Sequence, residues 1–181
     1  MKVQESQLKG VMLIDINVYE DQRGFFMEGF NKKRYKEIGI EIDFVQDNLS
    51  YSRKNIIRGL HFQNPEAQAK LVSVIKGKVY DVIVDLRKKS PTFGCWEGFL
   101  LSDENRRQLY VPEGFAHGFS TLSEEAYFYY KCSEYYSPGS EYCIRWDDPE
   151  LGINWLVDSP TLSEKDQKGI YLKELSVEKY F

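Results

Sequence analysis

The densest run of chemically active side chains is Arg58-Gly59-Leu60-His61-Phe62-Gln63, which Lys70 follows seven residues later. It contains one of only two histidines in the chain. An imidazole with a cation on either side is the combination needed to remove a proton while an anion is held nearby. A histidine between two apolar side chains is also typical of a buried core position. The run alone therefore leaves both interpretations of His61 open.

The rest of the inventory favours chemistry without a metal or a cofactor. His61 and His117 lie 56 residues apart with no H-x-H pair, whereas metal sites in β-barrels usually combine two or three histidines with a carboxylate. The chain has no G-x-S-x-G elbow, phosphate loop or G-x-G-x-x-G run. Spacing alone leaves a Cys–His pair or a Ser–His–Asp triad open. What remains is acid–base chemistry with His61 as base, a carboxylate to orient it, Lys70 or Arg58 to hold an oxyanion, and a tyrosine as proton donor.

Composition limits the class of protein. A chain of 181 residues with 42% hydrophobic and 15% aromatic content suits one folded domain, residues 1–181, rich in β-structure. The net charge of −4 and the pI near 5.4 argue against nucleic acid as a partner. Residues 1–10 lack the apolar core expected of a signal peptide, and no apolar run approaches the length of a membrane span. Three widely spaced cysteines without a CxxC pair indicate a reducing, cytoplasmic location.

Short strands separated by turns must position these side chains. Residues 79–86 alternate clearly, with Tyr80 and Val82 on one face and Val79 and Asp81 on the other. Helices are expected only over 32–38, capped by Asn31, and after Ser163. The pattern predicts an all-β sandwich or barrel of the jelly-roll type with short peripheral helices. Its strands are expected at 11–16, 23–30, 56–63, 69–76, 79–86, 95–101, 108–111, 116–122 and 126–132, with an extended segment at 43–52.

Nine blocks, spread along nearly the whole chain, carry a resemblance to one enzyme family. They are 21–28 (DQRGFFME), 44–48 (FVQDN), 58–63 (RGLHFQ), 70–72 (KLV), 81–87 (DVIVDLR), 90–94 (SPTFG), 112–119 (PEGFAHGF), 145–149 (RWDDP) and 162–166 (LSEKD). In this order they closely resemble the dTDP-4-dehydrorhamnose 3,5-epimerases, cofactor-independent cupin-fold isomerases of nucleotide-sugar metabolism. The resemblance implies a cupin, or double-stranded β-helix, version of the jelly roll.

The resemblance also implies roles for four catalytic residues. His61 is similar to the base that takes protons from C3 and C5 of a 4-keto sugar, and Asp166 to the carboxylate that orients this base. Lys70 matches the lysine beside the C4 oxygen, and Tyr130 the tyrosine that returns a proton on the opposite face of the ring. Without the resemblance, Asp166 is a residue at a helix start, Lys70 an ordinary strand lysine and Tyr130 a core tyrosine.

A further set of residues is implied in substrate binding. Tyr136 resembles the aromatic residue on which the thymine stacks, with Tyr135 as the rival. In the family a neighbouring subunit of a homodimer completes the site, so Arg23 or Glu28 is expected to act across the interface. The implied binding residues are Arg23 and Arg58 for the diphosphate, Glu28, Gln46, Asp47 and Asn48 for the nucleotide end, and His117, Glu141 and Lys165 around the ligand.

The opening run poses a geometric problem. By strict strand alternation Arg58 and His61 point to opposite faces, yet the resemblance places both at the ligand. Either Gly59 forms a β-bulge that realigns them, or the long arginine side chain reaches around a sheet edge.

The expected function is therefore inversion of C3 and C5 in dTDP-4-dehydro-6-deoxy-D-glucose, on the way to dTDP-L-rhamnose and cell-surface polysaccharide. One alternative within the same fold is an epimerase that acts at one carbon, or a ketoisomerase. Another is a non-catalytic nucleotide-sugar binder, against which the complete acid–base set argues.

Overall fold

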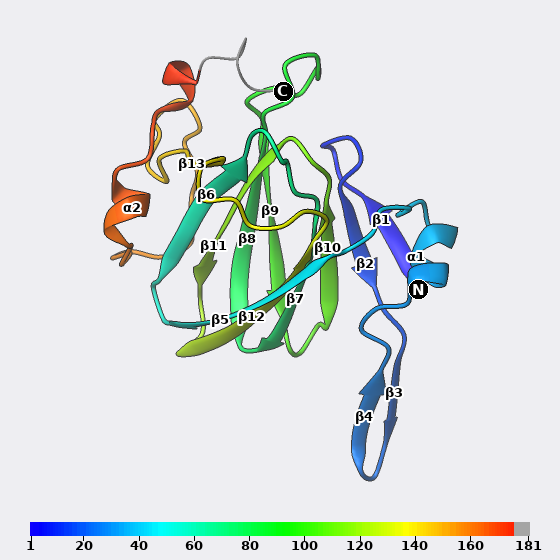
Figure 1. Cartoon of the computed structure of the whole chain (residues 1–181). Helices are drawn as coiled ribbons and strands as arrows, with labels where there is room; N and C mark the ends of the chain where they lie inside the picture. Colours follow the sequence, from blue (N-terminus) through cyan, green and yellow to red (C-terminus); the bar gives the residue numbers. More distant parts are fainter. Residues whose placement is uncertain (176–181) are drawn as a thin grey trace.

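Two antiparallel sheets face each other and form the body of the protein (Figure 1), whose computed structural model describes residues 1–175. The first sheet has six strands in the order β1-β2-β10-β7-β12-β5. The second has five strands in the order β13-β6-β11-β8-β9. The first sheet comprises β1 (Lys2–Glu5), β2 (Met12–Asp15), β10 (Arg107–Val111), β7 (Lys70–Lys76), β12 (Glu125–Cys132) and β5 (Gln46–Arg53); the second comprises β13 (Glu141–Cys143), β6 (Ile57–Gln63), β11 (Phe115–Thr121), β8 (Lys78–Asp85) and β9 (Trp96–Ser102).

The five-stranded sheet is covered on both faces, which explains why its central strands are almost entirely buried. On β8, Val79 and Ile83 pack into the core between the sheets, whereas Val82 and Val84 pack against the C-terminal segment. That segment, with Leu151 and Trp155 at its centre, runs along the outside of this sheet (Figure 1). The alternation predicted for residues 79–86 is therefore confirmed, and both faces of β8 are buried.

The six-stranded sheet is covered over only part of its outer face. Helix α1 (Lys32–Glu37) places Tyr35 against Ile14 and Leu71 there. The predicted cap of this helix is confirmed, because the Asn31 side chain accepts a hydrogen bond from the backbone N–H of Arg34. Over β5, β12 and β7 the outer face carries exposed apolar side chains: Leu49, Tyr51, Ile75 and Tyr127.

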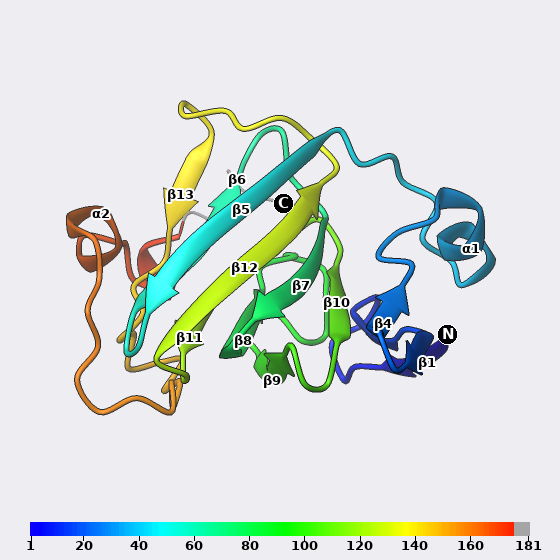
Figure 2. The same cartoon turned by 90° about the horizontal axis from the view of Figure 1, so that it is seen from below.

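A separate two-stranded arm, β3 (Val18–Asp21) and β4 (Gly24–Met27), extends away from the body (Figure 1) and is seen nearly end-on in Figure 2. Its aromatic residues Phe25 and Phe26 are more than half exposed.

The observed elements agree with the predicted all-β jelly-roll class, and two short helical turns, α2 (Glu164–Gln167) and η1 (Leu172–Glu174), lie near the end of the described residues. Three short strands were not anticipated: β1, β3 and β13. In the described residues no helix has the length and apolar character needed to cross a membrane. Residues 176–181 of the expected domain lie outside the described residues.

Candidate active site

A cavity of about 260 Å³ between the two sheets is lined by seven of the fourteen predicted site residues. One wall comes from β6 and β11, and the other from β5, β7 and β12. Its lining consists of Ser50, Arg58, His61, Lys70, His117, Gly118, Phe119, Phe128, Tyr130, Tyr136 and Glu141.

A β-bulge in β6 brings Arg58 and His61 to this one cavity. In the pairing of β11 with β6, His117 lies opposite His61 and Phe119 lies opposite Arg58. The two pairs are two residues apart on β11 but three residues apart on β6, so β6 carries one extra residue. Gly59 has φ of +117°, and a Cβ atom there would lie 2.7 Å from the carbonyl oxygen of His117. The sequence left two explanations open, a bulge at Gly59 or an arginine that reaches around a sheet edge. The structure shows the bulge.

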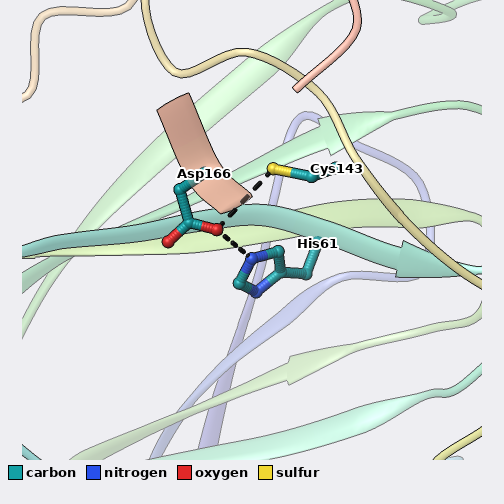
Figure 3. Close-up of side chains that lie close together, drawn as sticks. All are labelled: His61, Cys143 and Asp166. Atoms are coloured by element: carbon teal, nitrogen blue, oxygen red, sulfur yellow. Dashed lines mark hydrogen bonds and ion pairs between the residues drawn. The ribbon is translucent and has the colours of Figure 1, made fainter. Parts of the chain in front are cut away.

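His61 forms a pair with Asp166, although 105 residues separate them (Figure 3). The distance from His61 Nε2 to Asp166 Oδ1 is 2.5 Å. Ser163 caps α2 by accepting the backbone N–H of Asp166, which fixes the carboxylate at the first turn. Burial raises the pKa of Asp166, but the hydrogen bond and charge of His61, with contacts from Ser163 and the Gly59 backbone, outweigh burial and hold that pKa below its usual value.

An ionised Asp166 determines which nitrogen of His61 is free to act. A carboxylate only accepts hydrogen bonds, so Nε2 must carry the proton that faces it. Nδ1 then holds a lone pair, and no hydrogen bond reaches it from any residue in the described range 1–175. The imidazole is therefore arranged to accept a proton at Nδ1.

A second imidazole–carboxylate pair and a lysine lie on the same cavity. His117 Nε2 is 2.9 Å from each carboxylate oxygen of Asp81, whose side chain is completely buried. Burial raises the pKa of Asp81, and the neighbouring His117 and Lys70 partly oppose this rise. Burial lowers the pKa of Lys70, against the opposing charges of Cys132, Asp81 and Glu141. A lysine with a lowered pKa is a stronger proton donor toward a developing oxyanion.

Tyr130 reaches the cavity from the sheet opposite His61. It lies on β12 of the six-stranded sheet, whereas His61 lies on β6 of the five-stranded sheet. Burial, with added repulsion from Cys132 and Glu141, raises the pKa of Tyr130 to about 12, so its hydroxyl stays protonated at neutral pH. Lys70 Nζ lies 5.9 Å from the centre of its ring. A proton acceptor and a proton donor thus face the cavity from two different walls.

Polar side chains at the rim of the cavity form one connected chain of hydrogen bonds. The hydroxyl of Tyr136 donates to Glu141 Oε2 over 2.6 Å, and Glu141 also forms an ion pair with Lys165. The backbone N–H of Tyr136 donates to Gln46 Oε1 over 2.8 Å. Gln46 Nε2 in turn donates to Asn48 Oδ1 over 3.0 Å. These contacts fix the rim while leaving the Tyr136 ring 52% exposed.

Arg58 is held by only part of its guanidinium group. Its Nε donates to Ser52 Oγ over 2.9 Å, and its Nη2 donates to the carbonyl oxygen of Tyr51 over 3.0 Å. Nη1 makes no hydrogen bond within the described chain and remains available to an anion.

Six of the ten predicted binding residues do not line the cavity within one chain. Gln46, Asn48 and Lys165 belong to the hydrogen-bonded rim, and the other three make contacts elsewhere. Arg23 lies in the turn of the β3–β4 arm with its side chain 85% exposed. Glu28 follows β4 and forms an ion pair with Arg34 over 3.1 Å. Asp47 points to the outer face of β5, where it accepts a hydrogen bond from Lys131 over 2.7 Å.

The structure also adds residues that sequence reasoning missed. Phe128 could have been predicted from the sequence, because it lies two residues from Tyr130 and therefore on the same face of the strand. Asp81 could not, because its contact with His117 depends on the pairing of β8 with β11. Tyr136 and not its neighbour Tyr135 lines the cavity. The other missed lining residues are Ser50, Gly118 and Phe119.

Known proteins of one family match this chain over nearly its full length. The profile of the dTDP-4-dehydrorhamnose 3,5-epimerase family matches residues 5–174. An enzyme of that name from Methanothermobacter thermautotrophicus is 51% identical over 94% of each chain. A Legionella pneumophila 3,5-epimerase, solved with dTDP-4-keto-L-rhamnose, superposes with a TM-score of 0.96 at 48% identity, covering 99% of this chain and 96% of that one. A dTDP-4-dehydrorhamnose 3-epimerase from Streptomyces niveus is 42% identical over 96% of this chain and 85% of its own. With its two-sheet fold and a cavity that gathers an imidazole–carboxylate pair, a lysine and a tyrosine, the chain belongs to the dTDP-4-dehydrorhamnose 3,5-epimerase family.

Proposed function

We propose that this protein is a cofactor-independent epimerase that inverts C3 and C5 of dTDP-4-dehydro-6-deoxy-D-glucose. The observation that carries the proposal is the placement of His61 with Asp166, Lys70 and Tyr130 on one cavity between the sheets. The ligand named for the Legionella relative is the 4-keto-L-sugar expected as the product.

Each inversion begins with removal of a proton from a carbon next to the C4 ketone. His61 Nδ1 accepts this proton, and the ionised Asp166 stabilises the resulting imidazolium through Nε2. Negative charge moves onto the C4 oxygen, where Lys70 stabilises the enolate.

The inversion ends when the carbon receives a proton on its other face. Tyr130 supplies that proton from the wall of the six-stranded sheet, opposite His61. Its raised pKa keeps the hydroxyl protonated until the enolate, a stronger base, accepts the proton. The same pair of residues serves C3 and C5, since both carbons flank the same ketone. Between the two inversions His61 releases its proton to solvent and the Tyr130 phenolate takes one from solvent.

The nucleotide part of the substrate extends along the rim. Arg58 offers its free Nη1 to the diphosphate, because a guanidinium forms strong charged hydrogen bonds with phosphate oxygens. Tyr136 presents an exposed ring on which the thymine stacks. The remaining polar contacts that this chain makes with the substrate come from Gln46, Asn48, His117, Glu141 and Lys165.

A homodimer completes the site in this proposal. The exposed apolar side chains on β5, β12 and β7 provide a surface for a second copy, which also covers Asp47 on the same face. The β3–β4 arm then carries Arg23 and Glu28 to the partner's cavity, which neither residue reaches within its own chain.

Mixed dimers test this arrangement. A heterodimer of H61A and R23A subunits contains one cavity with both residues intact only if Arg23 acts across the interface. Mixing the two inactive variants is then expected to restore turnover, and sedimentation should show a dimer. A mixture that stays inactive would contradict the arrangement.

The proposed setting is the cytoplasm, where the product would be reduced to dTDP-L-rhamnose for cell-surface polysaccharide. Three free cysteines, two of them buried, support a reducing compartment.

Deuterium incorporation tests the reaction itself. In heavy water, wild-type protein and dTDP-4-dehydro-6-deoxy-D-glucose should give a product labelled at both C3 and C5. Label at C3 alone would instead identify a 3-epimerase like the Streptomyces relative, and a 3-keto product would identify a ketoisomerase. An unlabelled, unchanged sugar would refute the proposal. As a control, H61A should lose turnover but keep its affinity for dTDP, because the rim is unchanged.

A further inference from the structure

Cys143 lies beside the catalytic pair but takes no part in the proposed reaction. It sits on β13, where it is the strand partner of His61 on β6. Its Sγ is 3.8 Å from Asp166 Oδ1, the same oxygen that contacts His61 (Figure 3). One ligand atom from each of the three residues lies within 4.8 Å of the others.

We propose that His61, Cys143 and Asp166 form a binding site for a thiophilic divalent cation, of the Zn²⁺ or Cd²⁺ class, whose occupation inhibits the enzyme. An imidazole nitrogen, a thiolate and a carboxylate oxygen are the ligand types that zinc prefers. Two anionic ligands and a neutral imidazole balance the charge of a divalent ion. The fourth position of a tetrahedral site would be left for water.

The three ligand atoms already lie near one another. Metal bonds of about 2.0–2.3 Å place tetrahedral ligands within about 4 Å of one another. The three atoms lie within 4.8 Å of one another, and the ion must widen the 2.5 Å contact between His61 Nε2 and Asp166 Oδ1. The three residues come from β6, β13 and α2, so the surrounding fold holds each in place independently. His61 is 30% exposed on its side chain and offers a route from the cavity to the otherwise buried group.

Occupation of the site would block proton transfer without filling the substrate cavity. A cation on Nε2 withdraws electron density from the imidazole of His61 and takes Asp166 away from it, so Nδ1 no longer accepts a proton. The rim residues are untouched. Inhibition should therefore lower kcat and leave dTDP affinity unchanged.

The test compares the wild-type protein with C143A and with C95A, in which an exposed cysteine away from the cluster is removed. In chelator-free buffer, turnover and dTDP affinity are measured against Zn²⁺ and Cd²⁺, with Mg²⁺ as a hard-cation control. Wild type and C95A are expected to be inhibited by Zn²⁺ and Cd²⁺ only. C143A should keep its turnover and require at least about tenfold more metal for the same inhibition, since it lacks one ligand. If C143A is poorly folded, C143S replaces it, because serine is close in size and a poor ligand for these ions.

A second readout does not depend on turnover, and so separates failure of this site from failure of the proposed reaction. Cadmium bound by a thiolate gives an ultraviolet charge-transfer band, expected with one Cd²⁺ per wild-type chain and absent from C143A. Equal inhibition of C143A and wild type, a band that persists in C143A, or loss of the effect in C132A instead would each overturn the proposal.

Discussion

Replacing Gly59 with alanine tests whether the bulge in β6 holds His61 in place. Gly59 has φ of +117°, and the new Cβ would lie 2.6 Å from Gly118 Cα and 2.7 Å from His117 O. Both contacts are with backbone atoms of a fully buried strand, which cannot move aside as a flexible side chain would. The unfavourable φ costs about 1–2 kcal/mol, and forced overpacking adds about 1–3 kcal/mol. The free energy of unfolding should therefore fall by about 2–5 kcal/mol.

Gly39 provides a matched control. Its φ of +92° is also unfavourable for alanine, but a Cβ there meets only Met12 Cε at 3.8 Å, an ordinary contact. G39A should lose about 1–2 kcal/mol, the conformational part alone. Urea denaturation of both variants isolates the contribution of the collision with β11.

The activity of G59A separates a merely weakened fold from a displaced base. At a temperature where the variant is folded, a shift of His61 by about 1 Å should lower kcat about 100-fold, whereas G39A should turn over normally. If G59A unfolds at the same urea concentration as G39A and keeps its turnover, the bulge does not require glycine at position 59, and the explanation is wrong.

Three further changes probe the catalytic pair, the acid and a buried carboxylate. D166N should reduce turnover by about 100-fold or more, because an amide cannot stabilise the imidazolium, while dTDP affinity measured by calorimetry stays unchanged. Y130F should still exchange the C3 proton for deuterium through His61 but form little inverted product, so label without inversion is the expected NMR result; normal inversion would assign the acid elsewhere. Burial raises the pKa of Asp85, but hydrogen bonds from Arg87, Ser90 and Thr92 outweigh it and hold the pKa at about 2, below the usual 3.8. That shift stabilises the folded state above about pH 4 and is lost as the pH falls toward 2, so D85N should be about 2 kcal/mol less stable than wild type at pH 7 and nearly equal at pH 2 in urea titrations.

Local sequence patterns correctly predicted those parts of the fold that depend on residues close together in the sequence. The alternation on β8 and the Asn31 cap of α1 both appear in the structure because each depends on residues only a few positions apart. Strand β13 was missed because its three residues, Glu141–Cys143, lie in a turn-rich segment and become a strand only by pairing with β6. Strand β1 was missed because its edge position and polar residues give no apolar alternation.

Local sequence patterns predicted less of the candidate site than of the fold. The pairing of His61 with Asp166 spans 105 residues, and only the family resemblance pointed to it. The proximity of Cys143 could not be predicted, because it requires the unpredicted strand. Within one chain Arg23 and Glu28 do not line the cavity, and the homodimer proposed to bring them to it is not specified by any pattern within one chain.

The position of Asp166 on α2 has a consequence for how the enzyme becomes active as it folds. Both sheets, and with them the cavity, are complete once β13 ends at Cys143. Asp166 comes 23 residues later, in a segment that is joined to the five-stranded sheet by short bridges such as Ile144 with Ile170 and by packing around Trp155. During synthesis the ribosome releases this segment after the strands of both sheets. A newly made chain therefore contains every strand that lines the cavity before it contains Asp166, and His61 acquires its partner only when the later segment packs against the sheet around Trp155.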